Sequence, residues 1–379
     1  MKIGFLGPAY PLRGGIAQFN MLLATEFNKE HEVKIFSFSK QYPKIIFPGK
    51  DQIDHSEAKP DLDIEPIVIP YNPLTWFSAV KKIKQWQPEI LILKYWIPFF
   101  APVFGWIIRR LKNNNIKVIY VIDNIVFHEK WYFAERLTKY ALGKADMLIT
   151  MSDSVYNDAK KILPKSNIVK GLHPIYNCYN LQKYSKESAR KKLKVEKKKV
   201  ILFFGYIKPY KGLELLIKSF PLILEELSDA HLVIVGEVYG DAAVYFNLIE
   251  KLELKNNVTF LNRFATNEEV ELYYKAADVL ALPYISATQS GVVQIAYDME
   301  LGAVATPVGG LSELVLNNKT GIMATDVTET EQIKKEHQLL FDQVPCSIFI
   351  LDRNFRIVKT NKKIRNTFGD TIGMHCYKV

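Results

Sequence analysis

The spacing of apolar residues along the chain constrains its fold more than any other feature of the sequence. Short apolar runs typical of buried strands alternate with longer runs in which apolar residues recur at helical spacing. Such alternation implies a parallel sheet covered by helices on both faces. In the first half, we expect strands at residues 2–6, 32–38, 66–69, 90–95, 117–121 and 147–151, with helices at 15–27, 74–86, up to about 112, and 131–142.

A charged segment at residues 183–199 interrupts this pattern, and its basic run at residues 190–199 reads as a solvated face or linker. The alternation then restarts, which predicts a second doubly wound sheet. Ligands of such sheets bind outside the carboxyl ends of the strands, and two sheets facing each other would enclose a cleft. We expect strands at residues 200–204, 231–235, 258–261, 279–282 and 303–306, with helices at 213–227, about 242–254, 267–277 and from 290.

Charge and cysteine usage narrow the class of protein. The 379 residues carry a formal net charge of +10, but no basic motif interleaved with aromatics indicates a nucleic-acid partner. Attraction to acidic headgroups or phosphorylated substrates fits the charge better. The three cysteines, Cys178, Cys346 and Cys376, are too few and too widely spaced for a disulfide framework or a zinc site.

The most apolar window, residues 95–108, contains two prolines and is too short to cross a bilayer. Burial between a strand and a helix is the favoured interpretation, and shallow contact with a membrane surface is the alternative. Residues 1–7 read as a first core strand, not as a signal peptide. We therefore expect a cytoplasmic protein that can lie peripherally at the inner face of the membrane.

A loop of small hydroxyl residues precedes the helix expected from residue 290. Unpaired amides and the helix dipole favour an anion there, and Gly291 allows a phosphate to approach the backbone. Ser286, Thr288, Gln289 and Ser290 add neutral hydrogen-bonding groups. The plain alternative is an ordinary capped helix.

Glycines recur at other expected strand ends. They are found at Gly14 and Gly15, at Gly205, at Gly236 before Glu237, and at residues 309–310. The loop after residue 204 also carries two lysines, Lys208 and Lys211, which could otherwise be exposed loop lysines. Together these strand ends indicate a phosphate-bearing ligand.

These residues resemble the retaining nucleotide-sugar glycosyltransferases of the GT-B fold, the glycosyl transferases group 1 or family 4 that build bacterial surface polysaccharides. The resemblance covers residues 1–321 and is most specific at residues 203–212, 277–291 and 303–313. It implies an α/β fold of two doubly wound Rossmann-like domains facing a cleft. Residues 1–182 would bind the acceptor, and residues 183–325 the donor, in a second domain that is truncated.

The resemblance also implies roles for single residues. Lys211 matches the lysine that holds the diphosphate, and Tyr206 replaces an arginine whose charge Lys208 can supply. His128 and Glu129 match a catalytic His-Glu element, although a lone histidine is commonly a core residue. The implied donor-binding residues are Gly14, Gly15, Gly205, Lys208, Lys211, Gly236, Glu237, Ser286, Thr288, Gln289, Ser290, Gly291 and Val292.

The chain departs from the family pattern where many members carry two glutamates. Thr288 and Ala296 occupy those positions, with Gln289 and Gln294 as nearby polar substitutes, although Gln294 could equally face solvent.

The one Asp-x-Asp match, residues 61–63, precedes a strand, so we expect no metal and no cofactor beyond a UDP- or GDP-linked sugar substrate.

Three further polar residues lie at strand ends of the first domain. Asp123 and Asn124 are candidates for contacts with the acceptor, and His173 reads as structural.

After Gly321 the sequence resembles parts of PAS sensor domains. Residues 322–337 resemble a PAS exit and signalling helix, and residues 339–361 the start of another PAS domain with a hairpin at 347–360. We expect this PAS-like fragment, residues 326–379, to bind no cofactor because most of a ligand pocket is missing. A helix at residues 332–341 could cover apolar surface.

Three functions follow from these patterns. The first is sugar transfer from a nucleotide diphosphate-sugar to a glycan or lipid-linked acceptor with retention. The second is weak or inactive nucleotide-sugar binding, because Thr288 and Ala296 replace the glutamates. The third is a sensory or interaction protein that works through its PAS-like tail.

Overall fold

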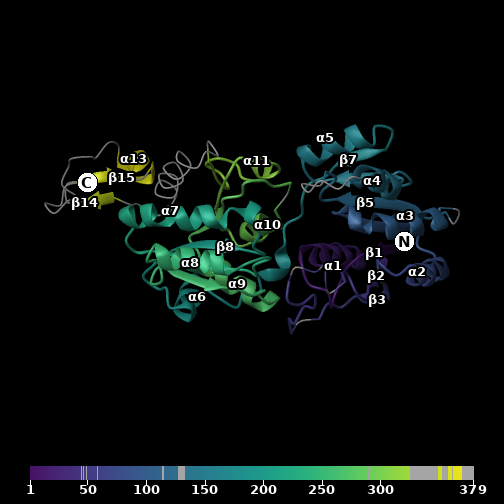
Figure 1. The fold of residues 1–379 in the computed structure, drawn as a ribbon, viewed down its shortest axis with the longest axis horizontal. Helices are drawn as coiled ribbons and strands as arrows, with labels where there is room; N and C mark the ends of the chain where they lie inside the picture. Colours follow the sequence, from purple (N-terminus) through teal and green to yellow (C-terminus); the bar gives the residue numbers. More distant parts are fainter. Residues whose placement is uncertain are drawn as a thin grey trace. The chain divides into compact units, whose positions relative to one another are not determined.

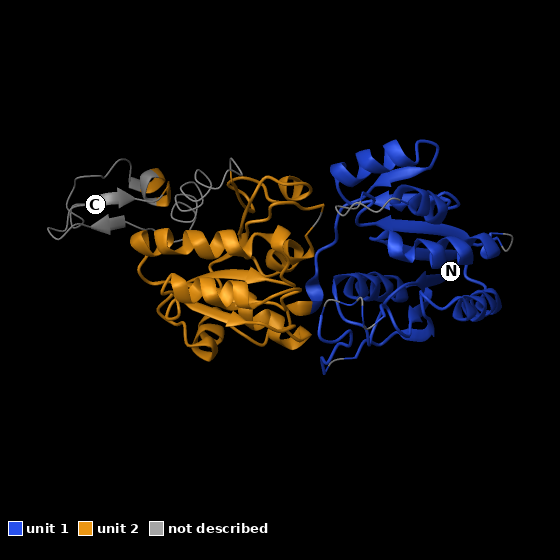
Figure 2. Cartoon of the chain, in the orientation of Figure 1, with its two compact units in different colours: residues 1–178 blue, residues 179–379 orange. Residues whose placement is uncertain are grey.

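The computed structural model divides the chain into two compact units, residues 1–178 (unit 1) and residues 179–379 (unit 2), as Figure 2 shows. Each unit is built on its own sheet. The structure describes residues 1–379 except 44, 46, 48, 58, 113–114, 127–132, 289, 325–348, 352–356, 361 and 369–379.

Unit 1 contains a seven-stranded parallel sheet with the order β3-β2-β1-β4-β5-β6-β7 (Figure 1). The strand order reverses between β1 and β4, so the carboxyl ends of these two strands flank the point where such sheets bind ligands. The strands are β1 (Lys2–Leu6), β2 (Glu32–Phe38), β3 (Asp63–Val68), β4 (Ile90–Tyr95), β5 (Lys117–Ile122), β6 (Met147–Thr150) and β7 (Ile168–Lys170). The helices are α1 (Gly15–Asn28), α2 (Pro73–Trp86), α3 (Ala101–Leu111), α4 (Ala134–Leu142) and α5 (Asp153–Ile162), with short 3-10 turns η1 (Pro98–Phe100) and η2 (Asn177–Tyr179).

The apolar window at residues 95–108 is part of the unit 1 core. Tyr95, Phe100, Phe104, Ile107 and Ile108 are all fully buried. These side chains come from the end of β4, from η1 and from α3, so the expected burial between strand and helix is confirmed. No helix among the described residues is long and apolar enough to span a membrane.

Unit 2 contains a six-stranded parallel sheet with the order β10-β9-β8-β11-β12-β13. Its order reverses between β8 and β11, so the prediction of two doubly wound parallel sheets is confirmed. The strands are β8 (Lys199–Phe204), β9 (Ala230–Val235), β10 (Val258–Leu261), β11 (Val279–Leu282), β12 (Ala303–Ala305) and β13 (Gly321–Met323). The helices are α6 (Lys186–Leu193), α7 (Leu213–Glu226), α8 (Ala243–Lys251), α9 (Asn267–Ala276), α10 (Gly291–Asp298) and α11 (Leu311–Leu314), with the 3-10 turn η3 (Pro209–Lys211).

The charged segment at residues 183–199 is not simply a solvated linker, because it contains α6. Ser185 caps this helix by accepting a hydrogen bond from the amide of Ser188. Arg190 and Lys186 both pair with Asp278, at 2.5 Å and 2.8 Å. Ala189 is the one buried residue of α6, so the helix has no apolar stripe that a sequence pattern could reveal.

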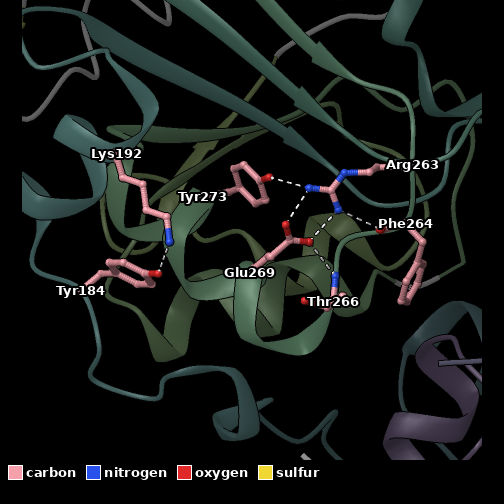
Figure 3. Close-up of polar contacts among 7 residues, drawn as sticks. All are labelled: Tyr184, Lys192, Arg263, Phe264, Thr266, Glu269 and Tyr273. Carbon is pink, nitrogen blue, oxygen red and sulfur yellow. Dashed lines mark hydrogen bonds and ion pairs between the residues drawn. The ribbon is translucent and has the colours of Figure 1, made fainter. Parts of the chain in front are cut away.

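Helix α9 is fixed at its start by a compact polar cluster (Figure 3). Thr266 and Glu269 form a capping box, in which each side chain bonds the backbone of the other residue. Arg263 donates two hydrogen bonds to the Glu269 carboxylate, both at 2.6 Å, and a third to the Tyr273 hydroxyl at 3.5 Å. This bidentate pairing holds the loop after β10 against α9.

The described parts of the tail lie in unit 2. Strand β13 begins where the family resemblance was expected to end, and it pairs with β12 as the edge of the sheet. The expected hairpin strands are present as β14 (Phe349–Leu351) and β15 (Ile357–Thr360), which pair antiparallel and precede α13 (Lys362–Phe368). The expected turn at residues 352–354 and the helix at 332–341 lie outside the described residues, and the PAS-like interpretation stays a prediction.

Replacing Glu271 should destabilise unit 2. This carboxylate on α9 is fully buried and accepts hydrogen bonds from the amides of Lys183 at 3.0 Å and Tyr184 at 3.5 Å, so it holds the start of the unit to the helix. We expect Glu271→Ala to lower the free energy of unfolding by about 2 kcal/mol, because two amides lose a charged acceptor.

Urea denaturation would measure this loss. Glu225→Ala, on an exposed position of α7, serves as the control and should change the free energy by less than about 0.5 kcal/mol. Equal stabilities of the two variants would contradict the anchoring role.

Candidate functional site

Two loops meet at the reversal point of the unit 2 sheet. The first follows β8 and runs from Gly205 to Gly212, and the second follows β11 and leads into α10. The amide of Ile285 in the second loop donates to the carbonyl of Tyr210 in the first at 2.7 Å. The carboxyl ends of β8 and β11 are therefore bridged by backbone contact.

Glycine is required at two positions of this junction. Gly212 has a φ of +69°, and a Cβ atom there would lie 1.8 Å from the carbonyl oxygen of Pro283. A Cβ atom at Gly236 would lie 1.9 Å from the carbonyl oxygen of Gly205. The loops after β8, β9 and β11 can approach each other this closely only because these residues lack side chains.

Lys211 is buried at the same junction, with 5% of its surface exposed. Its Nζ atom lies 4.0 Å from the ring centroid of Tyr206 and 5.3 Å from that of Tyr284. Burial lowers the pKa of Lys211, and Tyr206 partly opposes this. Among the described residues no carboxylate pairs with this ammonium. A buried cation of this kind favours an anionic ligand.

The first turn of α10 lies beside Lys211. A Cβ atom built at Gly205 would be 3.3 Å both from the Lys211 Nζ atom and from a methyl group of Val292, so the ammonium and the helix start flank the same glycine. Ser290 is the N-cap residue, but its hydroxyl contacts the Tyr284 hydroxyl at 3.2 Å and does not cap the helix. Burial raises the pKa of Tyr284 to about 12, so this phenol stays protonated. The first-turn amides of α10 therefore remain suited to an anion.

The other expected donor-binding residues of unit 2 differ in how deeply they are buried and in the backbone hydrogen bonds they make. Lys208 is half-buried just before η3, and the carbonyl of the buried Glu237 accepts from the Ile207 amide at 2.8 Å. Ser286 and Thr288 are half-buried, and the Thr288 carbonyl accepts from the Gly310 amide at 3.2 Å. Gln289 lies outside the described residues.

Two alternatives left open by the sequence concern α10 and the Asp-x-Asp match. Gln294 is buried, so the interpretation as a solvent-facing residue is wrong, and Ala296 is fully buried beside it. Asp63 begins β3 and accepts a hydrogen bond from Lys34 at 3.1 Å, which makes it part of a surface ion pair. Among the described residues there is no cluster of three or more metal-ligating side chains.

In unit 1 the loop that carries Gly14 leads into α1, which begins at Gly15. Gly14 is the N-cap residue of α1, with a φ of +112°, and no atom lies within 4 Å of a Cβ built at Gly14 or Gly15. His128 and Glu129, the expected catalytic pair, lie outside the described residues. His173 is half-buried with its ring 5.8 Å from that of Phe19, and burial lowers its pKa.

The structure adds one residue that the sequence interpretation missed. Lys94, near the end of β4, is 2% exposed, and its Nζ atom lies 2.8 Å from an oxygen of Asp123. Its position in the sequence could have drawn attention to it, because Lys94 is the single charged residue in the otherwise apolar strand I-L-I-L-K-Y.

A separate hollow of about 850 Å³ lies at the opposite edge of the unit 2 sheet. Its lining includes Lys186, Asp278 and Gly302, at the amino ends of β11 and β12 and on α6. This position is remote from the strand ends that carry Lys211, so the hollow is not part of the candidate site.

Residues 185–351 match the family model described as "Glycosyl transferases group 1". The match extends beyond residue 321, where the resemblance was expected to end. An uncharacterized glycosyltransferase of Methanocaldococcus jannaschii is 32% identical over 182 residues, which are 46% of either chain. The chain spans about half the length of the first curated relatives that it matches.

Solved structures of glycosyltransferases share the fold. Sucrose-phosphate synthase from Thermosynechococcus elongatus has a TM-score of 0.67 at 18% identity, over 90% of both chains. Anabaena HepE, in complex with UDP and glucose, has a TM-score of 0.67 at 17% identity, also over 90% of both chains. At this identity the likeness shows the fold, and two α/β domains with parallel sheets are those of GT-B glycosyltransferases.

A methyl group at Gly212 should disrupt the junction of the two unit 2 loops. The strained φ and the contact with the Pro283 carbonyl together should lower the free energy of unfolding by more than about 2 kcal/mol in Gly212→Ala. Thermal or urea denaturation would measure the loss.

Gly15→Ala is the matched control, because Gly15 has no left-handed φ and free space around its Cβ position. This change at the first helical residue of α1 should alter stability by no more than about 1 kcal/mol. Tolerance of Gly212→Ala at the same level would show that the loops do not depend on this close approach.

Proposed function

We propose that this chain, which carries a glycosyl transferases group 1 domain, transfers a sugar from a nucleotide diphosphate-sugar to a glycan or lipid-linked acceptor with retention. The proposed donor is UDP- or GDP-linked, and the proposed role is surface polysaccharide or glycoconjugate synthesis. One observation carries the proposal. Lys211 is buried and pairs with no carboxylate in the part of the chain that the structure describes, and it flanks Gly205 together with the start of α10 at the reversal point of the unit 2 sheet. Anabaena HepE, whose fold is similar, has been crystallised with UDP and UDP-glucose.

The proposed chemistry requires charge neutralisation and no covalent nucleophile. As the bond between the sugar and the diphosphate breaks, negative charge develops on the leaving oxygen. The acceptor hydroxyl attacks from the same face, and its proton passes to the departing phosphate. The Lys211 ammonium and the amides of Gly291 and Val292 would stabilise that charge in a place shielded from water. Because these groups supply the charge, we propose that transfer needs no metal and continues in the presence of EDTA.

A nucleotide-sugar binder with little or no turnover is the second candidate function. The observation that favours it is that Thr288 and the buried Ala296 replace two glutamates of the family pattern. Turnover separates the two candidates: release of UDP from UDP-glucose or GDP from GDP-mannose supports transfer, whereas binding without release supports the second function.

The Lys211 site should give UDP binding a defined pH dependence. Burial lowers the pKa of Lys211 below its ordinary value of 10.5, and a bound diphosphate should raise it again. The affinity for UDP is therefore expected to be highest below the pKa that Lys211 has in the unliganded protein. It should fall as the pH rises through that pKa. Titration calorimetry with UDP between pH 7 and 10 would measure this.

Lys211→Met should weaken UDP binding at pH 7 by about tenfold or more and remove the alkaline fall, because a charged hydrogen-bond donor is lost. Lys255→Met, at a surface lysine paired with Glu250, is the control and should behave like the parent protein. A pH profile in Lys211→Met identical to that of the parent would refute the assignment of this lysine.

We also propose that unit 1 contacts anionic membranes through α2 and α3. Leu74 and Phe77 are 79% and 58% exposed on one face of α2. The Phe77 ring lies 4.6 Å from Trp106 of α3, and Arg110 lies over Trp106 at 3.5 Å. Exposed Lys81 continues the α2 face. Aromatic side chains bordered by basic ones suit the interface of an acidic bilayer.

The Leu74→Ser, Phe77→Ser double variant should bind phosphatidylglycerol vesicles about tenfold more weakly than the parent protein, because two apolar anchors are lost. Cosedimentation at low and moderate salt would measure binding, and phosphatidylcholine vesicles should bind less in every case. Leu172→Ser, at an exposed leucine outside this patch, is the control. Equal vesicle binding by the double variant and the parent would remove α2 from the contact.

A further inference from the structure

The reversal point of the unit 1 sheet holds a buried pair of opposite charges. Lys94 is the second-last residue of β4, and Asp123 directly follows β5, its hydrogen-bonded neighbour. The Asp123 amide donates to the Tyr95 carbonyl at 2.9 Å, which fixes the backbone beside Lys94. Both side chains thus lie at the carboxyl edge of the sheet, where doubly wound domains bind ligands.

Lys94 is enclosed on several sides. Its Nζ atom lies 2.8 Å from Asp123 Oδ1 and 3.0 Å from the ring centroid of Phe19 on α1. Burial lowers the pKa of Lys94, and the charge of Asp123 opposes this. The Asp123 carboxylate is its counter-ion, so the two groups together carry no net charge.

The polar atoms of this cluster are poorly satisfied. Although they are close, Lys94 Nζ and Asp123 Oδ1 are not aligned as a hydrogen bond, and among the described residues neither atom has another hydrogen-bond partner. The buried Oδ1 atom of Asn124 also lacks a partner there. A purely structural buried ion pair needs its remaining hydrogen-bonding capacity filled to offset desolvation, and this pair does not meet that condition.

The cluster also opens towards solvent on one side. Asp123 is 18% exposed although its partner is 2% exposed, and Asn124 next to it is half-buried. The exposed part of the Asp123 carboxylate and the Asn124 amide can accept and donate hydrogen bonds, respectively. His173 and the ring of Phe19, which are 5.8 Å apart, border the same cluster.

We infer that Asp123 and Asn124, with Asp123 positioned by Lys94, bind the hydroxyl groups of an uncharged sugar that serves as the acceptor. This inference rests on the proposed transfer function and names the class of acceptor. Carboxylate and amide groups match neighbouring hydroxyls, which need both acceptors and donors. A phosphate would face the Asp123 carboxylate and find the Lys94 charge already paired, so this site selects against anionic ligands.

Saturation-transfer NMR on the full chain can test the site with defined probes. We expect methyl α-D-glucopyranoside or methyl β-D-galactopyranoside to bind, and glucose 1-phosphate to bind more weakly than the better glycoside. Asp123→Asn should weaken glycoside binding by about tenfold, because a charged acceptor of hydrogen bonds is lost. Asp153→Asn, at a surface carboxylate of unit 1 paired with Lys170, is the matched control and should not change binding.

Lys94→Met tests the positioning role. It should weaken glycoside binding, and its effect combined with Asp123→Asn should be smaller than the product of the two single effects, because both changes remove the same arrangement. UDP affinity, measured on the same samples, should stay unchanged, since Lys211 lies in unit 2. Circular dichroism and thermal denaturation of the same samples show whether unit 1 of each variant is folded.

The outcomes separate this inference from the proposed function. If neither glycoside binds while UDP does, or if Asp123→Asn binds glycosides like the parent, the inference is wrong and donor binding stands. Tighter binding of glucose 1-phosphate than of the glycosides would also overturn it, because the site would then be an anion site. Asp123-dependent glycoside binding without any UDP binding would support the sugar site and refute the transfer function.

Discussion

Lys211 brings a positive charge to a place that is 5% exposed, and no carboxylate among the described residues accompanies it. The surrounding backbone is arranged to make this possible. Gly205 leaves room between the ammonium and Val292, and Gly212 lets the lysine loop contact the carbonyl of Pro283. A buried charge without a counter-ion is costly to the folded protein, and an anion that enters the site removes that cost. The proposed binding of a diphosphate would therefore stabilise this junction.

The sequence predicted those parts of the fold that depend on local patterns. Strands β2, β10 and β11 match their expected bounds because their apolar runs end at turn residues, and β4 matches although its apolar run continues into residues 95–108. Helix α6 could not be predicted in this way, since it is held by ion pairs with Asp278, which is distant in sequence. Lys94 was missed for a related reason: its role depends on Asp123 at the end of another strand. The Lys211 loop was found because its glycines and lysines are close together in sequence.

The two sheets place a buried lysine at corresponding points but with opposite electrostatic results. In unit 2, among the residues that the structure describes, no carboxylate pairs with Lys211, which lies beside the start of a helix, and this is why we propose an anionic ligand there. In unit 1 the Lys94 charge is cancelled by Asp123, and the exposed groups are a carboxylate and an amide. We therefore propose a charged donor for the first site and a neutral acceptor for the second. The difference comes from one carboxylate at a strand end.

Tyr206 stands where the family pattern has a second cation, a charge that Lys208 in the same loop is proposed to supply. Its ring lies 4.0 Å from the Lys211 Nζ atom and stacks on Tyr239, with centroids 5.4 Å apart. A cation–π contact replaces part of the lost hydration of the ammonium without adding charge. Because a lysine lacks the bidentate fork of an arginine, more of the charge of the proposed diphosphate would be stabilised by the amides of α10. The geometry of the helix start should then matter more to donor binding here than in a site with an arginine.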